Sequence, residues 1–220
     1  GRLKRFKFVS EAVRERVPAR VLDMGCGTGI YLTAPLARAF PEIHFLGVDS
    51  DARSIEHART ELRFPNLRFA DAAEFRDEAP FDLVIASEVL EHVDDPAPFL
   101  DRLVGLTSPS GGIILTVPNG YGPFEQFALV EALLNISGLQ RLLRVLKHFS
   151  ATGLNRPHAM AAPTLSVSPH VNFFSRSELL QMFEEAGLVL KRFQSNTFLC
   201  GYGVDTLIRN ESTIAWNASF

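Results

Sequence analysis

Residues 21–29 read VLDMGCGTG, the most informative stretch of this sequence for its architecture. It follows the start of an apolar run at Arg20 and leads into residues 28–40, whose pattern predicts a helix closed by Pro41. Three glycines at alternate positions permit left-handed backbone and let a ligand approach the main chain closely. A strand, a glycine-rich turn and a helix in this order are typical of the first unit of an open α/β sheet.

Further apolar runs alternate with helical patterns, which predicts a parallel sheet with crossover helices. The expected strands are residues 20–23, 44–49, 67–70, 81–87 and 113–118, and the expected helices between them include residues 51–64 and 96–107. Ser175 and Glu178 predict a capping box, which begins a helix that ends at Gly187. The runs 188–194 and 198–208 then predict an antiparallel strand pair. We therefore expect an α/β fold with seven strands in one domain, residues 1–220.

Residues 119–174 interrupt this pattern after the fifth strand. They combine a strong helical pattern over residues 125–149 with a loop rich in proline and alanine. Insertions of this length are often lids or binding loops, so we interpret this one as a candidate lid over an acceptor site. The alternatives are a helix packed on the domain with a solvated basic face, a homodimer contact, and an amphipathic helix on a membrane surface.

Composition excludes several classes of function. The 220 residues carry 22 Lys and Arg against 25 Asp and Glu, and this net charge of −3 argues against nucleic acid as the main ligand. A hydrophobic content of 46% argues against a disordered chain. We find no apolar run long enough for a membrane span and no signal-peptide pattern. Cys26 and Cys200 fit no disulfide framework or metal spacing, so reducing cytoplasm is the expected location.

Acidic residues indicate which ligand the glycine loop serves. Asp23 ends the first strand, where a carboxylate repels a pyrophosphate and attracts a cationic or amino-bearing ligand. Ile30 stands where the dinucleotide fingerprint needs glycine or alanine, which disfavours an NAD-dependent reductase. Asp49 ends the second strand, where an acid accepts hydrogen bonds from ribose hydroxyls, and Asp71 ends the third, where it can accept from an adenine amine. Together these acids predict a pocket for S-adenosylmethionine.

On these residues the sequence resembles the class I S-adenosylmethionine-dependent methyltransferases. VLDMGCGTG is similar to their first motif, LGVDS to their second-strand acid, and FDLVIASEVLEHV followed by GGIILTVPN to their fourth- and fifth-strand signatures. The pattern is most similar to small-molecule O-, N- and C-methyltransferases of the ubiquinone-pathway type. The resemblance implies a Rossmann-like, mostly parallel sheet ordered 3-2-1-4-5-7-6, with the seventh strand antiparallel and helices on both faces.

The resemblance also implies the ligands and their binding residues. The cofactor is S-adenosylmethionine, with S-adenosylhomocysteine as its product, and the partner is a small-molecule acceptor. The glycines pass under the methionine moiety, Asp49 holds the ribose, and Asp71 with Ala72 faces the adenine. The full set of candidate cofactor-binding residues is Asp23, Gly25, Cys26, Gly27, Gly29, Asp49, Ser50, Asp71, Ala72 and Ser87.

The candidate catalytic residues are His92 and His170. At helical spacing Glu88, Glu91 and His92 share one arc of a turn beside the expected methyl group. His92 suits a general base, although a histidine that only caps the turn is the alternative. The two glutamates and two histidines could instead bind a divalent cation that orients vicinal hydroxyls. We favour a site without metal, because the E-x-x-E-H pattern is also similar to that of metal-free relatives.

Two further functions stay open at this point. The basic N-terminal residues and a basic arc over residues 141–147 are compatible with an RNA or protein methyltransferase. A regulatory module that binds S-adenosylmethionine without turnover is the non-enzymatic alternative. The intact glycine loop and the Glu/His turn favour an enzyme that methylates a small metabolite.

Overall fold

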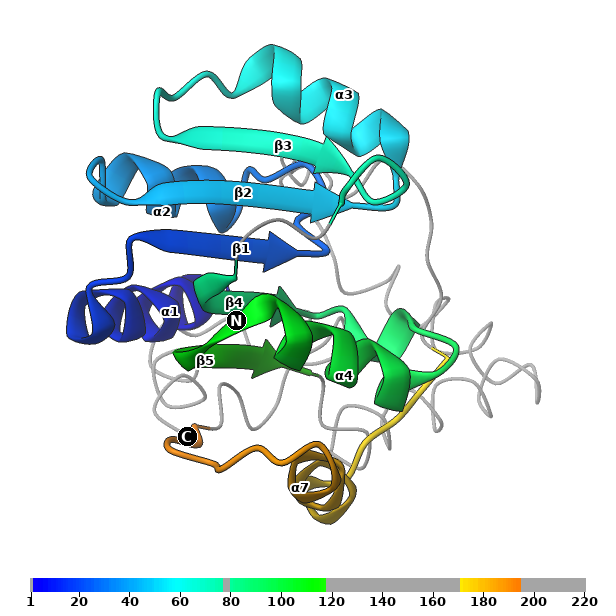
Figure 1. Ribbon diagram of the computed structural model, residues 1–220. Coiled ribbons are helices and arrows are strands. Elements are labelled where there is room, and N and C mark those ends of the chain that lie inside the picture. The colour runs from blue at the N-terminus through cyan, green and yellow to red at the C-terminus, as the bar shows by residue number, and fades with distance from the viewer. Residues whose placement is uncertain (1, 77–79, 118–170, 195–220) are drawn as a thin grey trace, which may run out of the picture. The chain divides into compact units, whose positions relative to one another are not determined.

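The computed structural model describes residues 2–76, 80–117 and 171–194, and all of these except Gln194 belong to one compact unit. Five parallel strands form a single sheet in the order β3-β2-β1-β4-β5 (Figure 1). The strands are β1 (Arg20–Met24), β2 (His44–Asp49), β3 (Leu67–Asp71), β4 (Phe81–Ser87) and β5 (Thr107–Thr116). This order confirms the predicted Rossmann-like parallel core.

Helices cover both faces of this sheet. One hydrophobic core receives side chains from α1 (Arg2–Arg16), α2 (Thr33–Ala39) and α3 (Ala52–Glu61). The other receives side chains from α4 (Pro96–Leu106) and α7 (Arg176–Glu185). Side chains alternate across a strand, so the central strand β4 supplies Leu83 and Ile85 to the first core and Val84 and Ala86 to the second. Burial on both faces explains why this strand reads as an almost unbroken apolar run.

The register of the strands aligns their carboxyl ends. Asp49 of β2 lies opposite Asp71 of β3, and Ser87 of β4 lies opposite Thr116 of β5. Residues that follow these strands therefore share one edge of the sheet, which is where ligands bind in open α/β folds. The sheet thus presents the predicted acids at a common edge.

Two element boundaries differ from the sequence prediction. Helix α2 begins at Thr33 and not at Thr28, because the glycine loop continues as turns through Leu32. Strand β5 begins at Thr107 and not at Ile113, so Gly111 and Gly112 lie inside the strand. A register shift between Phe81 and Leu83 of β4 accommodates the extra residues, as a β-bulge does.

Helix α7 begins as predicted. The Ser175 hydroxyl accepts a hydrogen bond from the Glu178 amide at 3.2 Å, and the Glu178 carboxylate accepts one from the Ser175 amide at 2.7 Å. Gly187, in left-handed backbone at φ 71°, follows the helix. Both features confirm the capping box and the glycine stop.

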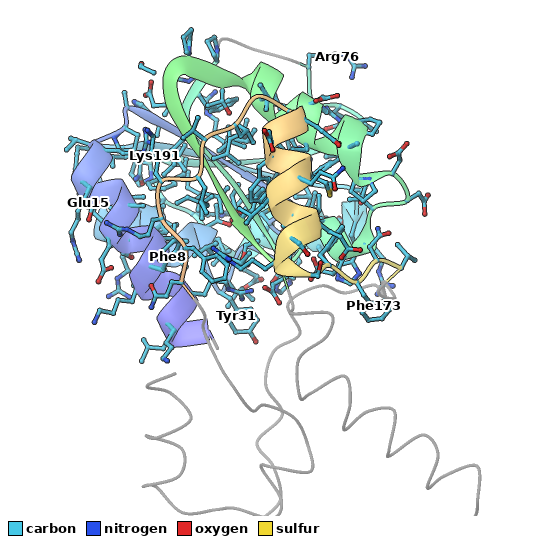
Figure 2. The ribbon with its side chains drawn as sticks, turned by 90° about the horizontal axis from the view of Figure 1, so that it is seen from below. Phe8, Glu15, Tyr31, Arg76, Phe173 and Lys191 are labelled. Atoms are coloured by element: carbon cyan, nitrogen blue, oxygen red, sulfur yellow. The ribbon has the colours of Figure 1, made fainter. Side chains whose placement is uncertain are left out.

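The strand predicted after α7 is absent from residues 188–194, which carry no regular secondary structure. This segment instead runs beside α1, where Glu15 and Lys191 lie on the same side of the molecule (Figure 2). Arg192 donates to both carboxylate oxygens of Glu15, at 2.7 and 2.9 Å. The predicted strand 198–208 and residues 119–170 of the predicted insertion lie outside the described residues. Within the described ranges, no helix has the length and apolarity needed to cross a membrane.

Candidate functional site

The glycine loop is folded back onto the end of β2. The amides of Gly25 and Cys26 both donate to the Val48 carbonyl oxygen, at 2.7 and 3.1 Å. Gly25, Gly27 and Gly29 have positive φ angles of 78°, 56° and 69°, which side-chain-bearing residues rarely adopt. The sequence prediction of left-handed backbone in this turn is therefore confirmed.

Space as well as dihedral angle requires glycine here. A Cβ atom at Gly25 would overlap the side chain of Val89, which follows β4. A Cβ atom at Gly29 would lie 2.6 Å from the Phe69 ring on β3. The loop is thus packed against the Val89 and Phe69 side chains, and this packing requires glycine at both positions.

Asp49 organises the loop through both of its carboxylate oxygens. Oδ2 accepts from the Gly27 amide at 2.7 Å, and Oδ1 accepts from the Asp51 amide at 2.8 Å. Its carbonyl oxygen accepts from the Ala72 amide at 2.8 Å, which places Ala72 against the end of β2. Each carboxylate oxygen keeps capacity for a further donor, so these bonds are compatible with the predicted role toward ribose hydroxyls.

Asp23 is buried beneath the loop, with 2% of its surface exposed. Thr33 donates its hydroxyl to Oδ2 at 2.6 Å. Burial raises the pKa of Asp23 to about 6, while the Thr33 hydrogen bond and the charge of Arg5 oppose that rise. Arg5 and Thr33 were not predicted as site residues; Arg5 belongs to α1, a helix that the sequence analysis did not anticipate.

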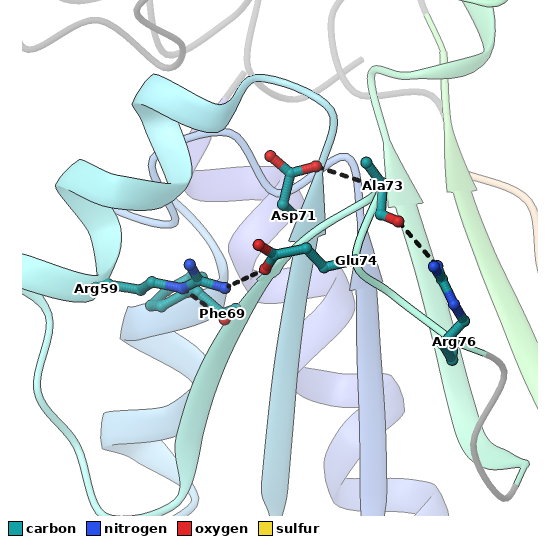
Figure 3. Close-up of polar contacts among 6 residues, drawn as sticks. All are labelled: Arg59, Phe69, Asp71, Ala73, Glu74 and Arg76. Atoms are coloured by element: carbon teal, nitrogen blue, oxygen red, sulfur yellow. Dashed lines mark hydrogen bonds and ion pairs between the residues drawn. The ribbon is translucent and has the colours of Figure 1, made fainter.

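The edge predicted to face adenine has its own polar framework (Figure 3). The Asp71 carboxylate accepts from the Ala73 amide at 2.8 Å, which closes a turn directly after β3. Arg59 of α3 donates to the Phe69 carbonyl oxygen at 3.0 Å and pairs with Glu74 at 3.3 Å. Arg76 donates to the Ala73 carbonyl oxygen at 2.8 Å. These contacts fix the loop that carries Asp71.

Three remaining candidates for cofactor contact differ in environment. Burial, with the nearby charges of Asp23 and Asp49, raises the pKa of the Cys26 thiol, which therefore stays neutral. Ser50 is exposed at the end of β2. The Ser87 hydroxyl lies 2.9 Å from the hydroxyl of Thr116 on β5.

The turn after β4 is not the helical arc that the spacing suggested. Glu88 has a positive φ of 59°, and only Leu90–His92 form a short 3-10 turn, η1. Glu88 is exposed and accepts from the Thr116 hydroxyl at 2.9 Å, whereas Glu91 is 1% exposed. The prediction that Glu88 and Glu91 share one face is wrong, because the left-handed residue redirects the chain between them.

Glu91 is a buried acid whose two carboxylate oxygens find no hydrogen-bond partner within the described residues. Burial raises its pKa to about 7, and the charge of Glu88 adds to the rise. The His92 side chain is 24% exposed, and its Nε2 lies 4.0 Å from Glu91 Oε1. His170 lies outside the described residues.

A metal-binding cluster is not found in the described parts of the chain, where no three His, Cys, Asp or Glu side chains converge. The separation of exposed Glu88 from buried Glu91 accounts for this. The arrangement of the described residues does offer a glycine loop, three strand-end carboxylates and a turn with a partly exposed histidine at one sheet edge. Such a site suits a nucleoside that carries an amino group.

Comparisons with known proteins identify the class. A family model described as a methyltransferase domain matches residues 3–191, so the chain belongs to that family. The resemblance to class I S-adenosylmethionine-dependent methyltransferases is thereby confirmed.

Relatives in two enzyme groups are similar to part of the chain. Trans-aconitate 2-methyltransferase of Methylobacterium radiotolerans is 38% identical over 104 residues, which cover 46% of this chain and 39% of that protein. Ubiquinone biosynthesis O-methyltransferase of Rhodopseudomonas palustris is 33% identical over 117 residues, covering 51% and 45%. The chain thus spans less than half the length of these relatives. The solved plantazolicin methyltransferase BpumL, in complex with a monoazolic desmethylPZN analog and SAH, matches with a TM-score of 0.47 and 22% identity, over 54% of this chain and 47% of that one.

Proposed function

We propose that this protein transfers a methyl group from S-adenosylmethionine to a small-molecule acceptor. The observation that carries the proposal is the glycine loop of residues 25–29, held by Asp49 at a sheet edge that also presents Asp23 and Asp71. The positive φ angles and the close packing against Val89 and Phe69 require glycine at Gly25 and Gly29, and they fix the path of the loop at this edge. The acids favour hydroxyl and amino groups over phosphate.

Different residues would bind different parts of S-adenosylmethionine. Asp49 would accept from the ribose hydroxyls, Asp71 from the adenine amine, and Asp23, when ionised, would attract the amino group of the methionine moiety. The guanidinium of Arg5, whose charge acts on both Asp23 and Glu91, would balance the methionine carboxylate. These roles explain why a site lined by acids includes one arginine from the N-terminal helix.

When bound, S-adenosylmethionine supplies a methyl group on a sulfonium; the acceptor atom attacks that carbon in line, and the electron pair of the broken carbon–sulfur bond stays on sulfur. The protein's residues mainly hold the two ligands in line and exclude water. An acceptor hydroxyl must also lose its proton, and we propose His92 or His170 for that task. A carboxylate acceptor would need no base.

The names of the relatives support an oxygen atom on a small organic acid or a quinone precursor as acceptor. We propose that residues 119–174 contribute the acceptor side of the site and that further strands from outside the described residues complete the sheet, in the order 3-2-1-4-5-7-6 that the resemblance implies. We propose that methyl transfer needs no metal ion; Glu88 is exposed and Glu91 is buried, so these two carboxylates do not share one face.

A labelled-methyl assay tests the proposal. The chain is incubated with methyl-labelled S-adenosylmethionine and either trans-aconitate or fractions of a cell extract, and each product is identified by its mass gain. We expect transfer to one small molecule, unchanged by exhaustive chelation. Binding of S-adenosylhomocysteine without transfer to any fraction would support the regulatory module instead, and incorporation into RNA or protein would redirect the acceptor class.

A further inference from the structure

A two-residue segment far along the chain holds the turn that carries His92. The amides of Val171 and Asn172 both donate to the carbonyl oxygen of Glu91, at 2.8 and 3.0 Å. The Asn172 side-chain amide donates to the carbonyl oxygen of Val93 at 2.5 Å and, at 3.4 Å, to that of Leu90. Three main-chain oxygens of one turn are thus bound by two adjacent residues.

A short 3-10 turn needs such partners. Within the turn the Leu90 carbonyl oxygen accepts only a long hydrogen bond, 3.4 Å from the Val93 amide. Carbonyl groups at the end of a helical turn lack helical donors, and buried ones left without a donor are destabilising. A side-chain amide with two N–H groups can serve two of them together, which a hydroxyl or a carboxylate cannot do. Asn172 therefore has the chemistry that the turn requires.

The other end of the turn is held from β5. Glu88 has a left-handed backbone that a non-glycine residue adopts only when its surroundings enforce it. Its amide donates to the Thr116 carbonyl oxygen at 2.8 Å, and its carboxylate accepts from the Thr116 hydroxyl at 2.9 Å. Thr116 and Asn172 thus fix opposite ends of residues 88–93.

The buried carboxyl of Glu91 makes this restraint necessary. Neither of its oxygens has a hydrogen-bond partner in the described part of the chain, so a turn that opened would let the group reach water. His92 is the next residue, and any such opening would carry its imidazole away from the sheet edge. A restraint on the main chain of the turn is therefore a restraint on His92.

We propose that Asn172 is a positioning residue that fixes the orientation of the His92 imidazole at the sheet edge. A catalytic role for this orientation rests on the proposed function. The orientation itself can be measured without turnover. Asn172 acts through hydrogen bonds to the main chain of residues 90–93 and contacts no reacting atom.

The experiment compares Asn172→Ala and Asn172→Asp with the wild-type chain. Asn172→Asp keeps the shape of the side chain, but it loses both N–H donors and sets a carboxylate against carbonyl oxygens. Gln181→Ala is the matched control, because in the described part of the chain the Gln181 side chain bonds an exposed glutamate on α7. The readouts are the imidazole signals of histidine-labelled protein, assigned by the signal lost in His92→Gln, the Kd for S-adenosylhomocysteine, and turnover per folded molecule.

We expect the His92 signal to shift or broaden in both Asn172 variants and to stay unchanged in the control. The Kd for S-adenosylhomocysteine should stay within about twofold, because Asn172 bonds Leu90, Glu91 and Val93 and not Val89, which is the turn residue that packs on the glycine loop. Turnover should fall about 10- to 100-fold with kcat affected more than the KM for S-adenosylmethionine, as a misplaced reacting group predicts. Should Asn172→Ala fail to fold, Asn172→Ser, which keeps one donor, takes its place.

An unchanged His92 signal in a folded variant would overturn the proposal. So would a loss of S-adenosylhomocysteine affinity as large as the loss of turnover, because that would make Asn172 a support of the whole site. A wild-type chain that transfers no methyl group would defeat the proposed function alone, and the histidine signals would still decide the role of Asn172.

Discussion

Asp23 links the stability of this protein to pH at the level of one residue. Its folded-state pKa of about 6 lies above the ordinary value of 3.8, because burial disfavours the charged form. The stabilising contribution of the protonated carboxyl is therefore fully present below pH 3.8 and is lost as the pH rises through about 6. At neutral pH the buried Asp23 carboxylate is charged, although its burial disfavours the charge. Such perturbed groups are typical of ligand-binding sites.

We expect Asp23→Asn to stabilise the folded protein at pH 8 and to leave it unchanged at pH 4. The amide oxygen can still accept from Thr33, while the buried charge is removed. From the two pKa values the gain is at most about 3 kcal/mol in the free energy of unfolding. Urea unfolding at both pH values measures it, with Asp101→Asn on the exposed face of α4 as control. An Asp23→Asn variant no more stable than wild type at pH 8 would contradict the assignment.

Gly29 and Gly105 provide a matched pair of glycine positions. Gly29 has a φ of 69° and no room for a Cβ atom, because the Phe69 ring lies 2.6 Å from where that atom would be. Gly105 lies in α4 with nothing within 4 Å of its Cβ position. We expect Gly29→Ala to lower the free energy of unfolding by about 2 kcal/mol or more and to abolish S-adenosylhomocysteine binding.

The same measurements on Gly105→Ala should show a gain of about 0.5–1 kcal/mol and unchanged binding, because alanine favours a helix interior. Chemical unfolding and calorimetry compare the two variants directly. Equal effects at both positions would mean that neither φ nor the Phe69 contact constrains the loop.

At the scale of elements, one buried side chain holds the end of α2. The Asn66 amide donates to the carbonyl oxygens of Ala37, Phe40 and Ile43, at 2.9, 3.0 and 2.9 Å. These oxygens lie at and just after the C-terminus of the helix, where main-chain carbonyl groups lack helical partners. Asn66 thus joins the end of α2 to the start of β3.

We expect Asn66→Ala to lower the free energy of unfolding by about 2–3 kcal/mol, because it removes the side-chain donor from the Ala37 and Ile43 carbonyl groups, while that of Phe40 keeps the Ile43 amide at 3.1 Å. Asn66→Asp should cost at least as much, since it removes the donors and buries a carboxylate. Both changes are measured by urea unfolding, with the loss of the exposed α7 cap in Ser175→Ala, at about 1 kcal/mol, as the reference. A loss below about 0.5 kcal/mol in Asn66→Ala would show that water replaces the amide.

Local patterns predicted the elements that depend on local chemistry. The strand 44–49, the strand 81–87 and the capping box at Ser175 are confirmed, because apolar runs and capping residues specify them directly. The late start of α2 and the early start of β5 were not predictable, since they depend on how the glycine loop packs on Val89 and how β5 bulges against β4.

The features of the site also separate into those that the sequence predicts and those that depend on distant contacts. Its strand-end acids and glycines were readable from spacing, whereas the left-handed backbone of Glu88 was not, because it accompanies contacts with Thr116, which lies on another strand. Arg5 was also missed as a site residue, since α1 has no strong amphipathic pattern by which the sequence could place it.

At the scale of the whole molecule, the site gathers residues from distant parts of the chain onto one sheet edge. The charge of Arg5, on the first helix, acts to lower the pKa of both buried acids, Asp23 and Glu91. Segment 171–172 contacts the turn after β4, and Arg192 contacts α1. A ligand that fills the site therefore binds only the folded form, and it should stabilise the molecule as a unit.

We expect S-adenosylhomocysteine at 100 times its Kd to stabilise the protein by about 2.7 kcal/mol, which raises the Tm by about 5–10 °C for a chain of this size. The shift should shrink as the pH falls from 8 to 5, because protonated Asp23 no longer attracts the ligand's amino group; the pKa of about 6 places the change between these values. Asp23→Asn should show a small shift at both pH values, and excess EDTA should leave the wild-type shift unchanged.

A thermal shift that is independent of pH in the wild type would separate Asp23 from ligand binding, and one that disappears with EDTA would restore the metal-dependent interpretation of Glu88, Glu91 and His92. The pH series and the chelator therefore test the charge of the site and its metal independence on the same intact chain.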